Sequence, residues 1–139
     1  YSMAHKLGAK HHVPHGVVNA LLINEVIKYN AVENPRKQGT FAQYEYPNAK
    51  RRYAIVAETL QLGGTTDDEK VELLIKAVQE LKDTVNIPKT ISAAGVKKED
   101  FYATLDEMSE LAFDDQCTGA NPRYPLIKEI KEMYIKVFE

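Results

Sequence analysis

The most continuously apolar part of the sequence runs from His15 to Tyr29. Its apolar residues cover most of the circumference of a helix instead of forming a single stripe. They are Val17, Val18, Ala20, Leu21, Leu22, Ile23, Val26 and Ile27. Because a helix with this pattern needs neighbours on several sides, the sequence predicts a central helix around which the rest of the chain packs.

A turn-rich connection with Asn34-Pro35 and Gly39 follows, and a second helix is predicted from Ala49 to Leu60. Its apolar face is expected to carry Tyr53, Val56, Ala57 and Leu60. Gly63-Gly64 lies between this helix and the next. We interpret the glycine pair as a C-cap and turn.

The next helix is predicted to begin at Thr66, because Thr66-Asp67-Asp68-Glu69 has the form of a capping box. In this motif the Thr hydroxyl and the Glu carboxylate satisfy free amides of the first turn, and the acids suit the helix dipole. Apolar residues then recur at spacings of three and four until Ile87-Pro88, where proline disfavours a helix. They are Val71, Leu74, Ile75, Val78 and Leu81.

The last third of the sequence predicts a short helical turn around Ser92 that ends at Gly95, followed by two longer helices. The stripe of the first longer helix is Phe101, Leu105, Met108 and Ala112. A loop from Gln116 to Pro125 comes next, and Pro125 is acceptable in the first turn of the terminal helix. That helix is marked by Leu126, Ile127, Ile130, Met133 and Val137. Since no alternating strand pattern or internal repeat is found, the sequence predicts an all-α, bundle-like fold of about six helices.

Composition and charge narrow the classes of function. The 139 residues, 44% of them hydrophobic, suit one compact core, so residues 1–139 are expected to form a single all-helical domain. The net charge of -2, with acidic and basic residues mixed, gives no basic stripe for nucleic acid or an anionic membrane. The stretch Val17 to Ile27 is far shorter than the roughly 20 residues of a bilayer span. With Cys117 as the only cysteine, a soluble, cytoplasmic protein is expected.

All four histidines fall close together, at His5, His11, His12 and His15. Imidazole is the commonest nitrogen ligand of transition metals and titrates near neutral pH, so the cluster fits a metal site, proton transfer, or surface and capping roles. His15 stands at a predicted helix N-terminus, where the dipole favours the neutral, metal-binding ring. The same spacing also fits a histidine that merely caps the helix. His11 and His12 diverge by about 100° on a helix, so both can hardly serve one ion.

Other polar groups have weaker functional interpretations. Asp114-Asp115 could chelate a divalent cation, but two acids at a helix end more often face solvent or hold a loop. Arg123 is interpreted as a structural clamp on a carboxylate, and Cys117 has no base beside it in the sequence. No Gly-rich phosphate loop or strand-helix alternation offers a dinucleotide site.

The stretch Met3-Ala4-His5-Lys6-Leu7-Gly8, continuing through Pro14-His15-Gly16 to Ala20-Leu21-Leu22, resembles the histidine-rich signature of the iron-containing alcohol dehydrogenase family. The segments Phe41 to Pro47 and Ala112 to Pro125, with the final helix, are similar to its bifunctional aldehyde-alcohol dehydrogenase branch. The resemblance implies the later part of an all-helical domain that follows a nucleotide-binding α/β domain. The upstream domain is expected to lie outside this sequence, since Tyr1 to Lys6 already read as mid-helix sequence.

In that family, Fe²⁺ is held by one Asp and three His. The resemblance implies that His15 is the last metal-binding histidine, and that His5 lies near the nicotinamide and assists proton transfer. His11 and His12 match no ligand position. Tyr1 stands where the family has another metal-binding histidine, and a phenol with an unperturbed pKa of about 10 is a poor substitute. The remaining ligands and the NAD-binding segment would lie upstream.

The resemblance also implies the activity of the parent protein. It would be an NAD-dependent and iron-dependent alcohol dehydrogenase that interconverts acetaldehyde and ethanol in fermentation, and it could form a homo-oligomer or filament. The isolated chain is expected to hold neither Fe²⁺ nor NAD tightly and to be inactive. The alternative is a helical structural or interaction module without catalytic activity, which Tyr1 and the missing upstream half favour.

Overall fold

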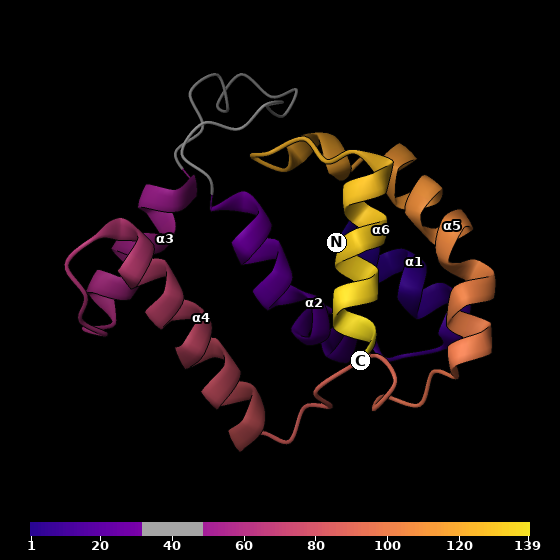
Figure 1. The fold of residues 1–139 in the computed structure, drawn as a ribbon, viewed down its shortest axis with the longest axis horizontal. Helices are drawn as coiled ribbons and strands as arrows, with labels where there is room; N and C mark the ends of the chain where they lie inside the picture. Colours follow the sequence, from indigo (N-terminus) through magenta and orange to yellow (C-terminus); the bar gives the residue numbers. More distant parts are fainter. Residues whose placement is uncertain (32–48) are drawn as a thin grey trace.

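The computed structural model describes residues 1–31 and 49–139, and it confirms the all-α fold in these residues (Figure 1). They form α1 (Ser2–His11), α2 (His15–Asn30), α3 (Ala49–Thr59), α4 (Asp67–Thr84), α5 (Lys98–Asp114), the short 3₁₀ helix η2 (Thr118–Ala120) and α6 (Ile127–Phe138). The predicted turn-rich connection lies outside the described residues. Within the part of the chain that the structure describes, no helix is long and apolar enough to cross a membrane.

Helix α2 is the central helix, as predicted. It lies between α3 and α4 on one side and α1, α5 and α6 on the other (Figure 1), and it packs directly against α1, α3, α4 and α6. Val18, Leu21, Leu22 and Ile27 are buried. Ile23, which the apolar pattern also assigned to the interior, is 41% exposed. Its side of α2 lines a cavity.

The main core lies where α1, α2, α5 and α6 meet. The predicted stripe of α5 is confirmed, because its four members are all buried there. Aromatic rings close the core: Phe101 of α5 stacks on Phe138 of α6 with their centroids 4.3 Å apart. The Ile91 amide donates to the Val137 carbonyl at 2.9 Å, so the hydrogen-bonded turn that ends at Gly95 joins the end of α6.

The terminal helix begins one residue later than its apolar pattern suggested. Ile130, Met133 and Val137 are buried as predicted, together with Tyr134 and Phe138. Leu126 and Ile127, in contrast, are 43% and 40% exposed. Leu126 is the N-cap residue, and its amide donates to the Glu129 carboxylate at 3.0 Å. Pro125 therefore precedes the cap instead of standing in the first turn.

Helices α3 and α4 form a separate helical hairpin. The face predicted for α3 was right for Ala57, which is buried with Ala54, but wrong for Val56 and Leu60, which are 46% and 56% exposed. The small alanine side chains allow α3 to approach α4, and the larger residues of α3 turn outward. On α4, Val71 and Leu74 are buried as expected, but Leu81 is 62% exposed, so only part of the predicted stripe is covered.

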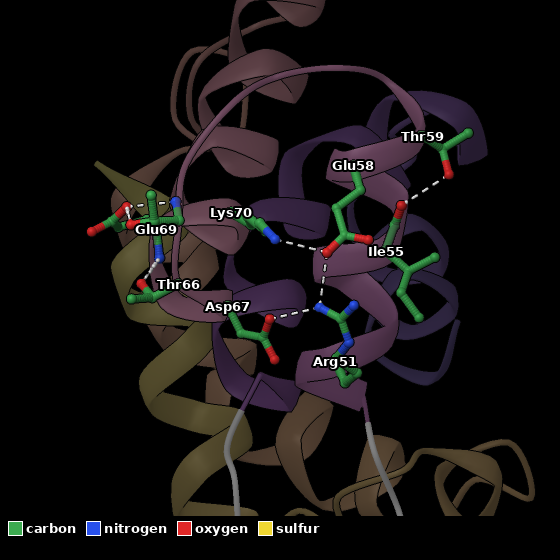
Figure 2. A network of polar contacts seen from close by, with 9 residues as sticks. Arg51, Ile55, Glu58, Thr59, Thr66, Asp67, Glu69 and Lys70 are labelled. Carbon is green, nitrogen blue, oxygen red and sulfur yellow. Dashed lines mark hydrogen bonds and ion pairs between the residues drawn. The ribbon is translucent and has the colours of Figure 1, made fainter.

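Polar side chains join the two helices of this hairpin (Figure 2). Arg51 of α3 lies 2.9 Å from the Glu58 carboxylate and 2.7 Å from that of Asp67, while Lys70 donates to Glu58 at 2.8 Å. The hydrogen bond from Lys70, followed by that from Arg51, holds the pKa of Glu58 below its usual range. The ionised carboxylate is therefore the form that the hairpin stabilises.

The predicted cap at the start of α4 is confirmed in its main contact. The Glu69 amide donates to the Thr66 hydroxyl at 3.2 Å. The Glu69 carboxylate accepts from the amide of Thr65, at 2.9 Å. These contacts satisfy one amide of the first turn and one just before the N-cap, which would otherwise lack a partner.

The C-terminal end of α3 is capped before the chain reaches Gly63-Gly64. Gln61 takes the left-handed conformation with φ 57°. Its amide donates to the Glu58 carbonyl at 3.0 Å, and the Leu62 amide donates to the Ala57 carbonyl at 3.1 Å. This is the hydrogen-bond pattern of a Schellman cap with Gln61 in the place that glycine usually takes. The glycine pair forms the turn, but the cap predicted there falls on Gln61.

Candidate active site

Three rings from two helices gather at one end of α1. The centroids of His5 and His15 are 5.5 Å apart, and the Tyr1 ring lies 6.0 Å from each of them. His5 and Tyr1 share a side of α1 because they are four residues apart, and His15 joins them from the first turn of α2. The two histidines that the sequence singled out are therefore neighbours in the fold.

His15 is oriented by its own helix. Its Nε2 lies 3.0 Å from the amide nitrogen of Asn19, one helical turn further along α2. The residue before it, Pro14, is the N-cap of α2, and no side chain caps this helix end. The capping interpretation of His15 is therefore wrong. Asn19 was missed in the sequence, although its spacing of four from His15 is a detectable signal.

The other two histidines lie at the opposite end of α1. His11 Nε2 contacts the Thr104 hydroxyl of α5 at 2.9 Å, and burial lowers the pKa of its imidazole while Asp100 opposes that shift. His12 is exposed and takes a left-handed conformation, with φ 54°, at the C-cap of α1. Neither ring contacts the His5 and His15 pair, so only two of the four histidines belong to the candidate site.

The candidate site lacks a complete set of common metal ligands in the described ranges. No three His, Cys, Asp or Glu side chains come together there in a way that could hold a metal ion. A catalytic zinc or iron centre typically uses about three protein ligands. The pair of imidazoles fits one part of such a site and does not complete it.

A cavity of about 540 Å³ is lined by Tyr1, one of the three rings. Tyr1 and Asn19, which contact the histidines, line one side of it. Leu22, Ile23 and Val26 of α2 line it as well, with Ile130 and Met133 of α6 and residues of the loop between η2 and α6. A small, partly apolar molecule could enter this space and reach the edge of the ring group.

The loop that closes the cavity is tied down near its start. The Asp115 carboxylate accepts from the Cys117 amide at 2.8 Å and pairs with Lys6 of α1 at 3.1 Å. The hydrogen bond from the Cys117 amide, followed by the contact with Lys6, holds the pKa of Asp115 below its usual range. Thr118 contacts the Ser2 hydroxyl at 2.8 Å. Asp115 therefore holds a loop, which was the preferred interpretation of the acid pair.

The far end of the loop is clamped to α2. Arg123 donates to the Tyr29 carbonyl at 2.8 Å, pairs with Glu129 at 3.1 Å and lies over the Tyr29 ring at 4.0 Å. Asn121 and the buried Asn30 exchange two amide hydrogen bonds, of 3.0 and 2.7 Å. The interpretation of Arg123 as a structural clamp is confirmed. The Asn30–Asn121 pair was missed, because residues 91 positions apart give no local signal.

The comparisons with known proteins agree with this arrangement. The model of the Fe-containing alcohol dehydrogenase family, C-terminal, matches residues 1–138. The aldehyde-alcohol dehydrogenase of Clostridium acetobutylicum is 60% identical over 139 residues, and the bifunctional aldehyde-alcohol dehydrogenase of Escherichia coli K12 is 53% identical over 140 residues. These matches take in 100% and 99% of this chain, but the chain spans only 16% of each relative.

Solved structures of alcohol dehydrogenases also resemble this chain in fold. A 1,3-propanediol oxidoreductase, 28% identical, superposes with a TM-score of 0.79 over 99% of this chain and 31% of its own. The iron-containing alcohol dehydrogenase of Thermococcus thioreducens, 32% identical, gives 0.70 over 99% of this chain and 30% of its own. With the family model matching from the first ring of the candidate site to the last residue of α6, this chain belongs to the C-terminal part of the Fe-containing alcohol dehydrogenase family.

Proposed function

We propose that this chain forms part of the metal-binding wall of an NAD-dependent, iron-dependent alcohol dehydrogenase that interconverts acetaldehyde and ethanol. We place it in the alcohol dehydrogenase part of a bifunctional aldehyde-alcohol dehydrogenase of the cytoplasm. The observation that carries the proposal is the 5.5 Å spacing of the His5 and His15 rings, whose neighbours Tyr1 and Asn19 line a cavity. The similarity to two aldehyde-alcohol dehydrogenases supports the choice of branch.

In this proposal the two histidines have different roles. His15 would be a ligand of the metal, and its Nε2 would exchange the hydrogen bond that the Asn19 side-chain amide donates for the bond to the metal. His5 would donate or accept a proton at the substrate oxygen from the adjacent turn of α1. Bound iron would supply Lewis-acid chemistry that polarises the carbonyl group, while NADH would supply the hydride.

The donor set of the chain limits what it can do alone. Two imidazoles are fewer ligands than a catalytic metal site requires, and Tyr1 is a weak donor while it keeps its proton. We therefore propose that residues 1–139 form one helical domain, and that an upstream nucleotide-binding domain of the parent protein completes the metal and NAD sites. The isolated chain would hold neither Fe²⁺ nor NAD tightly and would be inactive.

A chimeric enzyme tests this proposal. The matching 139 residues of the Clostridium acetobutylicum relative would be exchanged for this chain, with Tyr1 retained or changed as Tyr1→His. Iron content and NADH-dependent acetaldehyde reduction would be measured on the same anaerobic samples. We expect low iron and low activity with Tyr1, and recovery of both with Tyr1→His, because an imidazole binds iron at neutral pH.

His15→Ala and His12→Gln in the Tyr1→His chimera provide matched variants, since both residues are exposed. The first should abolish iron binding and activity, and the second should change neither. A folded Tyr1→His chimera that binds iron equally well with and without His15 would contradict the proposed ligand. A chimera that folds but never binds iron would favour a helical module without catalytic activity.

A further inference from the structure

The side-chain amide of Asn19 holds the ring nitrogen of His15 that the proposed function assigns to the metal. Asn19 Nδ2 lies 3.0 Å from His15 Nε2. An amide nitrogen can only donate, so Nε2 accepts this hydrogen bond with its lone pair, and the neutral ring carries its proton on Nδ1. A metal ion would need the same lone pair. Asn19 and the metal therefore exclude each other at Nε2.

Asn19 also lines the cavity. Leu22, Ile23 and Val26 line it as well, three, four and seven residues further along α2, so the four side chains share one face of the helix. From Asn19 to Val26 the wall thus has one polar group, next to His15, followed by apolar side chains. A compound with an oxygen at one end and a short hydrocarbon tail would match this order.

Other polar groups of the cavity wall are already used in the fold. The Tyr29 hydroxyl donates to Glu129 at 3.0 Å, and the Asn121 amide belongs to the clamp on α2. The Asn19 side chain has no hydrogen bond except that with His15 in the part of the chain that the structure describes. Since Asn19 is only half-buried, its amide can turn into the cavity once His15 releases it.

We infer that Asn19 is a substrate-binding residue that changes its partner when the metal binds. Its amide donates to Nε2 of His15 until that nitrogen binds the metal, and then donates to the oxygen of an aldehyde or alcohol in the cavity. This inference rests on the proposed role of His15 as a metal ligand. It has two consequences that a merely orienting residue would not have: the amide competes with the metal for Nε2, and it adds to the affinity for the substrate.

The first measurement uses the full chain, free of metal ions. Nitrogen NMR of the His15 ring at about pH 8, where an ordinary imidazole with a pKa of about 6.5 is neutral, shows which nitrogen carries the proton. We expect Nδ1–H in the original chain. Asn19→Leu, which keeps a side chain of similar size and removes the amide, should abolish this preference. A ring that carries Nε2–H in the original chain would face the oxygen of Asn19 instead of its nitrogen, and would overturn the inference.

The second measurement uses the Tyr1→His chimera, saturated with iron for the kinetic assays. Asn19→Leu should raise the affinity for iron roughly threefold, because one competing hydrogen bond is lost. It should also raise KM for acetaldehyde about three- to tenfold with little change in kcat, because one hydrogen bond to the substrate is lost. Removal of a residue that only orients His15 would instead lower the iron affinity. An iron affinity that does not rise, or a KM that does not change, overturns the inference.

Asn24→Leu is the matched control, because Asn24 lies on the same helix, donates to Gln79 of α4 and is not part of the cavity wall. It should change neither the iron affinity nor KM, and the same changes in both variants would overturn the inference. Circular dichroism verifies that each variant retains its helices. The proposed function fails separately, if His15→Ala leaves the iron binding of the chimera unchanged. The NMR measurement on the chain still reports on the contact between Asn19 and His15 in that case.

Discussion

The main core and the α3–α4 hairpin are built in different ways. Where α1, α2, α5 and α6 meet, large side chains such as Phe101, Tyr134 and Phe138 are almost completely buried. Of the described residues, none in α3 or α4 belongs to this core. The hairpin buries mainly small or medium side chains, and charged residues join its two helices at the surface. Apolar burial stabilises far more than exposed ion pairs do, so the hairpin is the less stable region.

The junction between the two regions is also partly polar. Asn24 of α2 donates to Gln79 of α4 at 2.9 Å. The buried Oδ1 of Asn24 accepts no hydrogen bond from the described residues. Lys82, on the same side of α4 as Gln79, is buried as well, and this burial lowers the pKa of its amine. Such groups lose hydration without full compensation, which weakens the attachment of the hairpin.

The largest effect is expected in the main core. Phe101→Ala should destabilise the whole chain by about 3–5 kcal/mol, because a fully buried ring leaves a cavity in contact with α6. Denaturant unfolding followed by circular dichroism measures this. Leu111→Ala in the same helix is the control, since Leu111 is 40% exposed. A loss confined to α5 would contradict the idea of one shared core.

A smaller and more local effect is expected from Leu74→Ala in α4. Removal of this buried side chain should cost about 2–3 kcal/mol, mostly in the opening of α3 and α4. Native-state hydrogen exchange should then show faster exchange of amides in these two helices, with α5 and α6 unchanged. Leu81→Ala serves as the exposed control. Equal acceleration in all helices would mean that the two regions unfold together.

Gln61→Gly should stabilise the hairpin by about 0.5–1 kcal/mol. Gln61 has φ 57°, a conformation that glycine adopts without steric strain. Slower exchange of the α3 amides would measure the gain. Gln61→Ala keeps a β-carbon in the same conformation and should give no such gain. Destabilisation by Gln61→Gly would show that side-chain contacts of Gln61 outweigh the strain.

The smallest effect on the stability of the hairpin is expected when the pH is lowered. Since the folded-state pKa of Glu58 is lowered, its contribution to stability is fully present above the ordinary glutamate pKa of about 4.3. It is lost as the pH falls through the lowered value. NMR peak intensities of α3 amides should therefore decrease only below about pH 4. Glu58→Gln should flatten this dependence, and a decrease that begins near pH 6 would point to another group.

Local patterns predicted most of the helices but not how the hairpin faces its neighbours. The stripe of α5 could be assigned because its members recur with helical period and all meet one core. In α3, Ala57 was assigned correctly but Val56 and Leu60 were not, because periodicity records hydrophobicity and not the fit between two helices. Alanines at positions 54 and 57 allow close approach, which only the partner helix reveals.

The candidate site could also be predicted only as far as local sequence patterns reach. His5 and His15 were singled out from the histidine cluster and the family signature, and the fold brings them together. The loop contacts of Asn121 and Arg123 with α2 cross more than 90 positions of sequence. The position of Arg123 could be interpreted as a clamp, but the groups it holds follow only from tertiary structure.

The hydrogen bond from the Tyr134 hydroxyl to the Met3 carbonyl joins residues 131 positions apart. During protein synthesis at about 5–20 residues per second, α1 would wait roughly 7–26 seconds for this partner to be made. Throughout that time the apolar sides of α1 and α2 have nothing from α6 to pack against. These apolar sides therefore stay without a partner from α6 for that whole period, and slower synthesis before α6 would lengthen it.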